Sequence, residues 1–191
     1  AENSSLTISN STISGNVAEH RGAGISYNND FYTPGTLTVT NSTISNNLAT
    51  GDSGTGSGIF YTSYDSVLSV TNSVFSNNAA TEAGGGIEMH GEANTVTVSG
   101  STFSGNSATL GGAIYNGTLN TVTITNCTFS NNTTSPTMEN YSNSAGGAIY
   151  NYTGELIVSN STFSNNAATV TNGSSHSASG GAIGNYSEPV T

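Results

Sequence analysis

The sequence predicts an all-β fold: a right-handed parallel β-helix of six coils that forms a single domain over residues 1–191. A block of eleven residues recurs six times, a glycine-rich block follows each copy, and chain length varies only between and after these blocks. Fixed blocks joined by variable segments are typical of solenoids, whose stacked coils tolerate loops at particular corners. The coils begin near residues 6, 37, 68, 96, 122 and 156, at spacings of 26–34 residues, and a seventh would begin at 190.

The first element of each coil is a strand. In LTISNSTISGN at Leu6 and LTVTNSTISNN at Leu37, aliphatic residues alternate with Thr or Ser, a period of two that indicates a strand with one apolar face. The alternation stops at an Asn or Gly, the residue types that best tolerate a left-handed backbone, so we expect a bend there. The bend positions are Asn10, Asn41, Asn72, Gly100, Asn126 and Asn160.

A second short strand follows the bend. Its inward position is always Ile or Phe: Ile13, Ile44, Phe75, Phe103, Phe129 and Phe163. After a second Asn or Gly, all six repeats carry an asparagine: Asn16, Asn47, Asn78, Asn106, Asn132 and Asn166. A column of identical amides in stacked coils predicts an internal ladder in which each side chain hydrogen-bonds to its neighbours.

The glycine block supplies a third strand. It reads GAGI at Gly22, GSGI at Gly56, GGGI at Gly84 and GGAI at Gly111, Gly146 and Gly180. Three short strands per coil, each pairing with the next coil at ~4.8 Å, describe a parallel β-helix. Right-handed connections are the rule between parallel strands.

Two of these motifs carry a resemblance to a known family. Phe-x-x-Asn alternates with Gly-Gly-Ala-Ile, in the segments Phe75–Asn78, Phe103–Asn106, Phe129–Asn132 and Phe163–Asn166 and at Gly111, Gly146 and Gly180. This pairing resembles the repeat of the polymorphic outer membrane proteins, which are β-helical autotransporter passengers and adhesins. The resemblance implies a β-helix that is extracellular or lies at the cell surface.

Composition excludes several classes of protein. The chain has one basic residue, Arg21, against eleven carboxylates, for a net charge of −10. Nucleic-acid binding needs clustered Lys or Arg, so we expect no nucleic-acid partner. No apolar run reaches the ~18 residues of a membrane span. The single cysteine, Cys127, replaces a serine of the repeat, which predicts a buried thiol rather than a metal ligand.

The sequence gives no strong sign of catalysis, so we expect no enzyme, no metal and no cofactor. Glu88 and His90, on or beside a third strand, are the best acid–base pair available, but outward polar residues are the favoured interpretation. Glu19, Asp52 and Glu82 precede the first three glycine blocks and are interpreted as a solvated acidic edge rather than a calcium site.

Asn-x-Ser/Thr sequons offer acceptors for N-linked glycans. Asn140 and Asn172 are the best candidates because they lie in the two long loops. The other candidates are Asn3, Asn116, Asn151 and Asn185.

We therefore expect a non-enzymatic extracellular structural protein. Neither end of the sequence shows a cap, so we expect a glycosylated subunit that stacks head to tail with copies of itself into a surface fibre. One alternative is a fragment of a longer adhesin or autotransporter passenger that binds a host or glycan ligand through the loops before Gly146 and Gly180. The others are an ice-binding solenoid with an outward Thr face and a carbohydrate-active β-helix enzyme.

Overall fold

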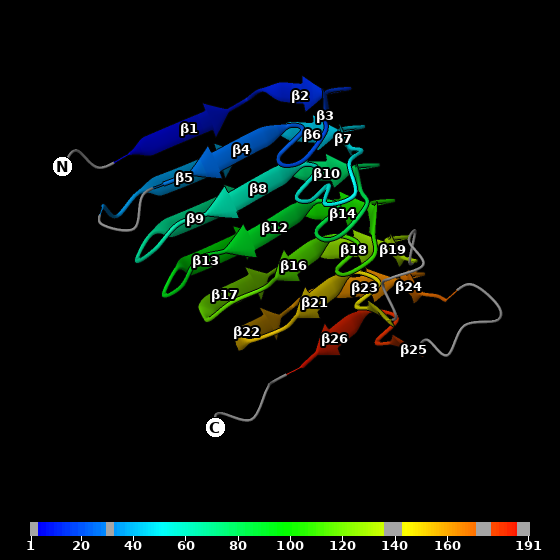
Figure 1. Cartoon of the computed structure of the whole chain (residues 1–191). Coiled ribbons are helices and arrows are strands. Elements are labelled where there is room, and N and C mark those ends of the chain that lie inside the picture. The colour runs from blue at the N-terminus through cyan, green and yellow to red at the C-terminus, as the bar shows by residue number, and fades with distance from the viewer. Residues whose placement is uncertain (1–3, 30–32, 136–142, 171–176, 187–191) are drawn as a thin grey trace.

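The computed structural model describes residues 4–29, 33–135, 143–170 and 177–186. Within these ranges all regular secondary structure is β-strand. The chain winds as a right-handed solenoid, with its first coil at one end and its last coil at the other (Figure 1). Equivalent strands of successive coils pair in parallel and form four six-stranded sheets. The predicted parallel β-helix is therefore confirmed. No helix long and apolar enough to cross a membrane lies in the described ranges.

Each coil contributes one strand to each of these four sheets. The first sheet contains β1 (Ser5–Ser9), β5 (Thr36–Thr40), β9 (Val67–Thr71), β13 (Thr95–Ser99), β17 (Asn120–Thr125) and β22 (Gly154–Ser159). The second contains β2 (Thr12–Ser14), β6 (Thr43–Ser45), β10 (Val74–Ser76), β14 (Thr102–Ser104), β18 (Thr128–Ser130) and β23 (Thr162–Ser164).

The third sheet contains β3 (Val17–Ala18), β7 (Leu48–Ala49), β11 (Ala79–Ala80), β15 (Ser107–Ala108), β19 (Thr133–Thr134) and β24 (Ala167–Ala168). The fourth contains β4 (Ile25–Asn28), β8 (Ile59–Thr62), β12 (Ile87–His90), β16 (Ile114–Asn116), β21 (Ile149–Asn151) and β26 (Ile183–Asn185). A small fifth sheet pairs β20 (Asn143–Ala145) with β25 (Ser177–Ser179).

The coil thus has four strands where the sequence indicated three. The additional strands are those of the third sheet, and each is two residues long. Two residues are too few to show a period of two, so sequence periodicity could not reveal them.

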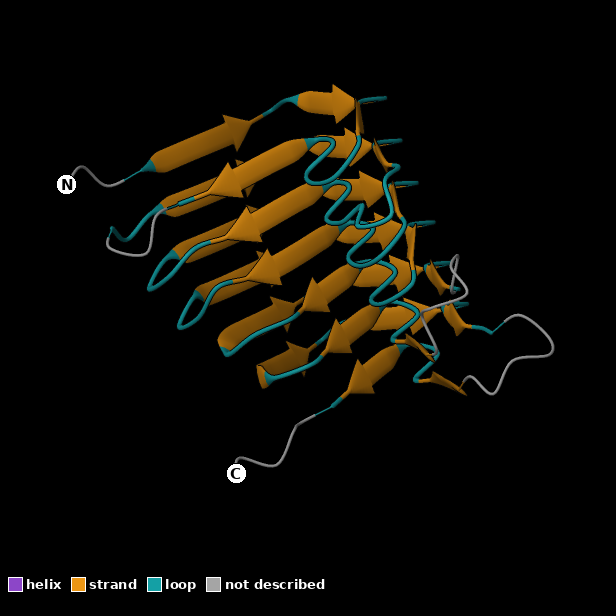
Figure 2. Ribbon diagram, viewed as in Figure 1, coloured by secondary structure: helices purple, strands orange, loops and turns teal. Residues whose placement is uncertain are grey.

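The coils stack in register despite their different lengths. Leu6 pairs with Leu37, Leu68 pairs with Val96, and Val122 pairs with Leu156. The extra residues of longer coils lie in the connections between strands (Figure 2). Each side chain therefore faces the equivalent side chain of the next coil at the parallel-strand spacing.

Residues with a left-handed backbone conformation form the bends between strands, as expected. The first bend has φ between 48° and 57° in all six coils, and the second bend has φ between 54° and 68°. The glycine block begins with another left-handed corner, at which Gly56 has φ of 55°. A Cβ there would lie 2.7 Å from the Ile59 carbonyl oxygen, so the chain folds back onto the fourth sheet only because glycine has no side chain.

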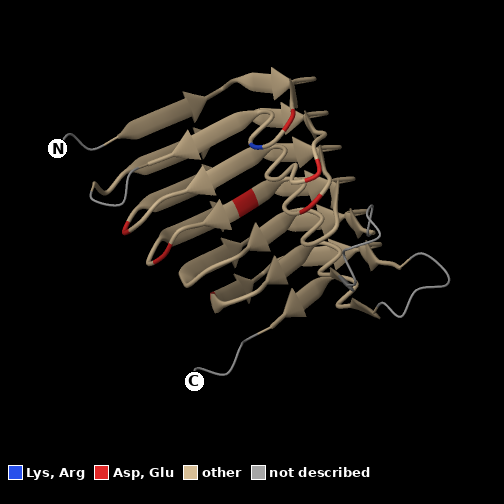
Figure 3. Ribbon diagram, viewed as in Figure 1, with Lys and Arg blue, Asp and Glu red and all other residues tan. Residues whose placement is uncertain are grey.

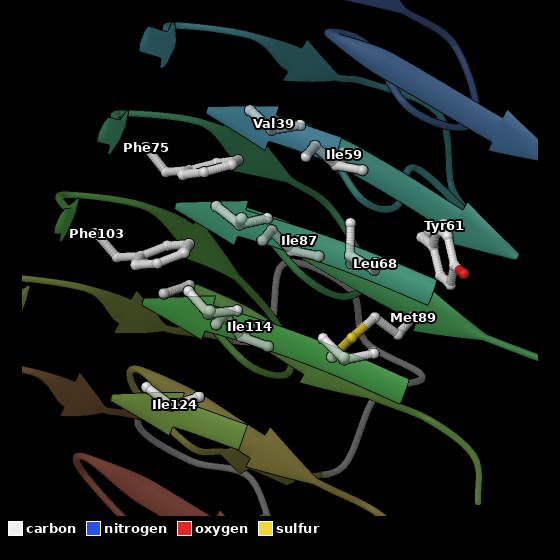
Figure 4. Close-up of a cluster of buried hydrophobic side chains, with 14 of the residues drawn as sticks. Val39, Ile59, Tyr61, Leu68, Phe75, Ile87, Met89, Phe103, Ile114 and Ile124 are labelled. Carbon is white, nitrogen blue, oxygen red and sulfur yellow. The ribbon is translucent and has the colours of Figure 1, made fainter. Parts of the chain in front are cut away.

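The interior is built from stacked columns of like side chains (Figure 4). The rings of Phe75, Phe103, Phe129 and Phe163 stack nearly parallel, with successive centroids 4.8, 4.9 and 4.8 Å apart. Aliphatic columns from the first and fourth sheets fill the rest of the core. In-register stacking therefore converts a repeated residue type into a continuous apolar column.

Replacement of a central ring tests this packing. Phe103 is fully buried between two other rings, so Phe103→Ala should lower the free energy of unfolding by about 3–5 kcal/mol. Val74, 38% exposed on β10, provides the control, and Val74→Ala should cost less than about 1 kcal/mol. Urea unfolding followed by circular dichroism measures both, and equal losses would contradict the packing described here.

Candidate functional site

The six repeated asparagines form one continuous ladder inside the coil. The side-chain Nδ2 of each donates to Oδ1 of the asparagine in the next coil, at 2.9–3.0 Å over all five steps. The backbone N–H of each also donates to that same Oδ1. The ladder residues are Asn16, Asn47, Asn78, Asn106, Asn132 and Asn166.

In the central residues of this ladder, both the oxygen and the nitrogen of the side-chain amide are hydrogen-bonded. Asn106 Nδ2 donates to Asn132 Oδ1 at 2.9 Å and to the Phe75 carbonyl at 3.0 Å. Its Oδ1 accepts from both Nδ2 and the backbone nitrogen of Asn78. Because the side chain is fully buried, each of these bonds replaces a lost bond to water. The ladder therefore fixes the inner corner of every coil.

Cys127 occupies the slot that serine fills in the other coils. Ser42, Ser73 and Ser101 are buried, and each accepts a backbone N–H from the preceding coil on its hydroxyl oxygen. The Cys127 sulfur is also buried, 3.2 Å from the Thr125 carbonyl oxygen, and burial raises the pKa of the thiol. A protonated, enclosed thiol fits a packing role.

A second amide ladder, which the sequence interpretation missed, follows the fourth sheet. Asn116 Nδ2 donates to Asn151 Oδ1 at 2.7 Å, and Asn151 Nδ2 donates to Asn185 Oδ1 at 2.8 Å. Asn120, the first residue of β17, donates through its Nδ2 to Asn116 Oδ1, which extends the ladder to the first sheet. The recurring Tyr-Asn pairs at 115–116 and 150–151 were the signal that could have revealed it.

This ladder corrects two of the expected glycan acceptors. Asn116 and Asn151 are 1% and 2% exposed and their amide nitrogens are already hydrogen-bonded, so neither has room for a sugar in the folded chain. Asn185 is exposed on β26 and remains a predicted acceptor. Asn3, Asn140 and Asn172 lie outside the described residues.

The outer face of the fourth sheet carries the cluster of functional groups that interrupts the repeat. Glu88 and His90 both lie on β12, and His90 Nε2 is 2.6 Å from Glu88 Oε1. A cavity of about 290 Å³ is lined by these two residues together with Arg21, Glu82 and Tyr115. The guanidinium of Arg21 lies 5.0 Å from the centre of the Phe60 ring, a cation–π distance.

Glu88 points outward from the sheet, as the sequence interpretation had it, but it is buried rather than exposed to solvent, which is a correction. It is 2% exposed, and its Oε2 has no hydrogen-bond partner among the described residues. The preceding turn covers Glu88. Gly84 in that turn packs so close that a Cβ on it would lie 2.7 Å from the Glu88 Cβ. An unpaired carboxylate oxygen that lines a cavity is available to accept a hydrogen bond from a ligand.

Aromatic rings extend this cluster along the axis. The His90 and Tyr115 rings are 6.2 Å apart, and the Tyr115 and Tyr150 rings are 5.9 Å apart. Tyr152 and Tyr186 continue the row, 5.3 Å from each other. Burial raises the pKa of Tyr115, with a further contribution from Glu88, and burial also raises the pKa of Tyr150. Both phenols therefore stay protonated and can donate hydrogen bonds at neutral pH.

Of the other acidic residues that the structure describes, Glu155 lies on β22 and the rest lie in the connections between strands. Acidic segments lie at the corners of several coils, with one on β12 (Figure 3). Glu19, Asp52 and Glu82 do precede successive glycine blocks, but the described residues contain no group of three or more His, Cys, Asp or Glu side chains placed to hold a metal ion. The long loops expected to hold a ligand fall largely in ranges 136–142 and 171–176, outside the described residues.

The inner ladder can be tested by truncating its centre. Asn106→Ala leaves the Asn78 amide groups and the Phe75 carbonyl without their partner, so we expect a loss of at least about 3 kcal/mol in the free energy of unfolding. Asn28, exposed at the end of β4, is the matched control, and Asn28→Ala should change stability by less than about 0.5 kcal/mol. Urea denaturation measures the free energy of unfolding of both variants. An Asn106→Ala chain as stable as the Asn28→Ala chain would contradict a structural role for the ladder.

Comparison with known proteins agrees with this architecture. Residues 100–117 and 126–152 match the Chlamydia polymorphic membrane protein repeat. These segments include two of the ladder asparagines and two GGAI blocks. No curated protein and no solved structure matches the chain. These two segments thus match a polymorphic membrane protein repeat, as the Phe-x-x-Asn and Gly-Gly-Ala-Ile motifs indicated.

Proposed function

We propose that this chain is a non-enzymatic surface protein whose β-helix serves as a rigid rod. The observation that carries the proposal is the asparagine ladder, which runs without a break through six coils. The polymorphic membrane protein repeat, from a family associated with the outer membrane and cell surface, supports a location outside the cell.

Rigidity follows from how the coils are joined. Every coil is bonded to the next by four parallel strands, by an inner amide and, through much of the core, by a stacked ring. To bend or open the rod, several of these contacts must break together, because they lie at the same junction. A protease must wait for such an opening before it can cleave backbone within the sheets. A rod of this kind suits a surface that is exposed to proteases.

Surface location is tested on intact cells of the organism that naturally produces this protein. We expect antibody raised against residues 33–135 to label intact cells, and added protease to remove that signal. A periplasmic protein serves as the control that must stay unlabelled. Labelling that appears only after the cells are permeabilised would contradict the proposal.

A second candidate is end-to-end stacking of copies, which the uniform register of the coils favours. Successive described coils are joined by the same four strand pairs and the same inner amide, although their lengths differ. One coil therefore presents the same bonding pattern to any neighbouring coil, including a coil from another copy of the chain. Such a contact is heterologous and does not close, so it yields a filament.

The purified 191-residue chain tests this stacking. We expect negative-stain electron microscopy to show filaments and light scattering to rise with concentration. Ile8→Lys, which places a charge on the inward face of β1, should abolish the filaments. Thr7→Lys adds the same charge to the outward face of that strand and should leave them intact. Monomers of the native chain at every concentration would refute self-assembly.

A further inference from the structure

Three neighbouring cavities lie along the outer face of the fourth sheet. The cavity beside Glu88 shares Arg21 and His90 with a second cavity of about 290 Å³ towards Phe60. On its other side it shares Leu110 with a third cavity, of about 430 Å³, lined by Tyr150, Tyr152 and Tyr186. We call these three adjoining cavities together the aromatic groove, and define it by Arg21, Phe60, Glu82, Glu88, His90, Tyr115, Tyr150, Tyr152 and Tyr186.

We propose that the aromatic groove binds a chain of neutral pyranose sugars that lies along the axis of the β-helix. This inference does not depend on the rod function proposed above. Its support comes from the spacing of the rings, the polar groups between them and the charge of the site.

The rings repeat at a distance that suits successive sugars. Neighbouring centroids from His90 through Tyr115, Tyr150, Tyr152 and Tyr186 are 5.3–6.3 Å apart. Two of these distances, Tyr115 to Tyr150 and Tyr152 to Tyr186, cross from one coil to the next and follow the ~4.8 Å step between parallel strands, which is close to the length of one pyranose ring. Tyr150 and Tyr152 lie two residues apart on the same coil. The planes of Tyr115 and Tyr150 are 37° apart, and those of Tyr150 and Tyr152 are 61° apart, so the rings do not cover one another fully. The half-buried rings thus offer apolar surface to the C–H faces of sugars.

The polar groups suit sugar hydroxyls. Glu88 Oε2 is buried and unpaired among the described residues, so a hydroxyl that donates to it would satisfy a group that otherwise lacks a partner. Thr55 Oγ1 lines the same cavity and is likewise buried without a partner in the described ranges. Arg21 and His90 provide donors at the same site. Aromatic and apolar side chains together with a small number of convergent polar groups are typical of a ligand site.

Charge favours a neutral sugar over an anionic one. The groove has two carboxylates, Glu82 and Glu88, against the single guanidinium of Arg21, and the whole chain carries −10. An acidic polysaccharide would be repelled by this surface. A neutral chain meets no such penalty and can use every acceptor in the groove.

The test uses four neutral hexasaccharides of different linkage: maltohexaose, cellohexaose, laminarihexaose and chitohexaose. Saturation-transfer NMR with the native chain should show transfer to the ring protons of at least one of them. Titration calorimetry should then give a Kd below about 1 mM for that sugar. No transfer from any of the four at 10 mM would overturn the proposal.

Variants locate the binding. Tyr115→Ala and Tyr150→Ala should each weaken binding about tenfold or more, whereas Tyr115→Phe, which keeps the ring, should stay within about threefold of the native chain. Glu88→Gln keeps the size of the side chain but changes its hydrogen bonding, and should weaken binding about fivefold. Val74→Ala, on the second sheet and outside the groove, should bind like the native chain. Circular dichroism confirms that each variant is folded. Undiminished binding by folded Tyr115→Ala and Tyr150→Ala chains would place the sugar elsewhere and refute the proposal.

Discussion

The hydrogen bond between one asparagine side chain and the next is the interaction on which the rest of this structure depends. An asparagine carboxamide donates and accepts in one plane, so it can bond to identical neighbours above and below at the spacing of parallel strands. Serine in the same place would lack the second donor, and aspartate would lack any donor. With Asn47, Asn78 and Asn106 joined in this way, the inner corner of each coil has one position and the strands that leave it are held in register. Insertions are then confined to the connections between strands.

Stacking in register also explains the composition of the chain. Each residue lies beside its equivalent in the next coil, so a column of like charges would place them ~4.8 Å apart, at a cost of about 3 kcal/mol per pair at an effective dielectric constant of about 20. Serine, threonine and asparagine carry no such cost and can bond along the column. This accounts for a chain in which only 6% of residues are charged. The groups of the aromatic groove stand out because Glu88 pairs with Phe60 on one side and Tyr115 on the other, in a column that does not repeat.

The regular part of this architecture could be predicted from the sequence, because its columns repeat the same residue type, or a similar one, in all six coils. The bends at Asn10 and Asn41, the phenylalanine column and the paired strands all follow from that repetition. The groove could not be predicted in the same way. Its residues come from coils with different connection lengths, so the proximity of Arg21 to Phe60 and the burial of Glu88 depend on how each turn folds. The burial of Asn116 and Asn151 could not be predicted either. The sequence of a sequon is the same whether its asparagine is exposed or hydrogen-bonded inside a second ladder.

The central claim, that the inner amides bind the coils into one cooperative rod, is tested most directly by hydrogen exchange of the asparagine side chains. NMR can follow the Nδ2 protons of Asn47, Asn78, Asn106 and Asn132, all fully buried, beside those of the exposed Asn28. The account predicts that the four ladder amides exchange as slowly as the most protected backbone amides of the sheets, because both need the coils to separate. Exchange of the ladder amides as fast as that of Asn28 would contradict it.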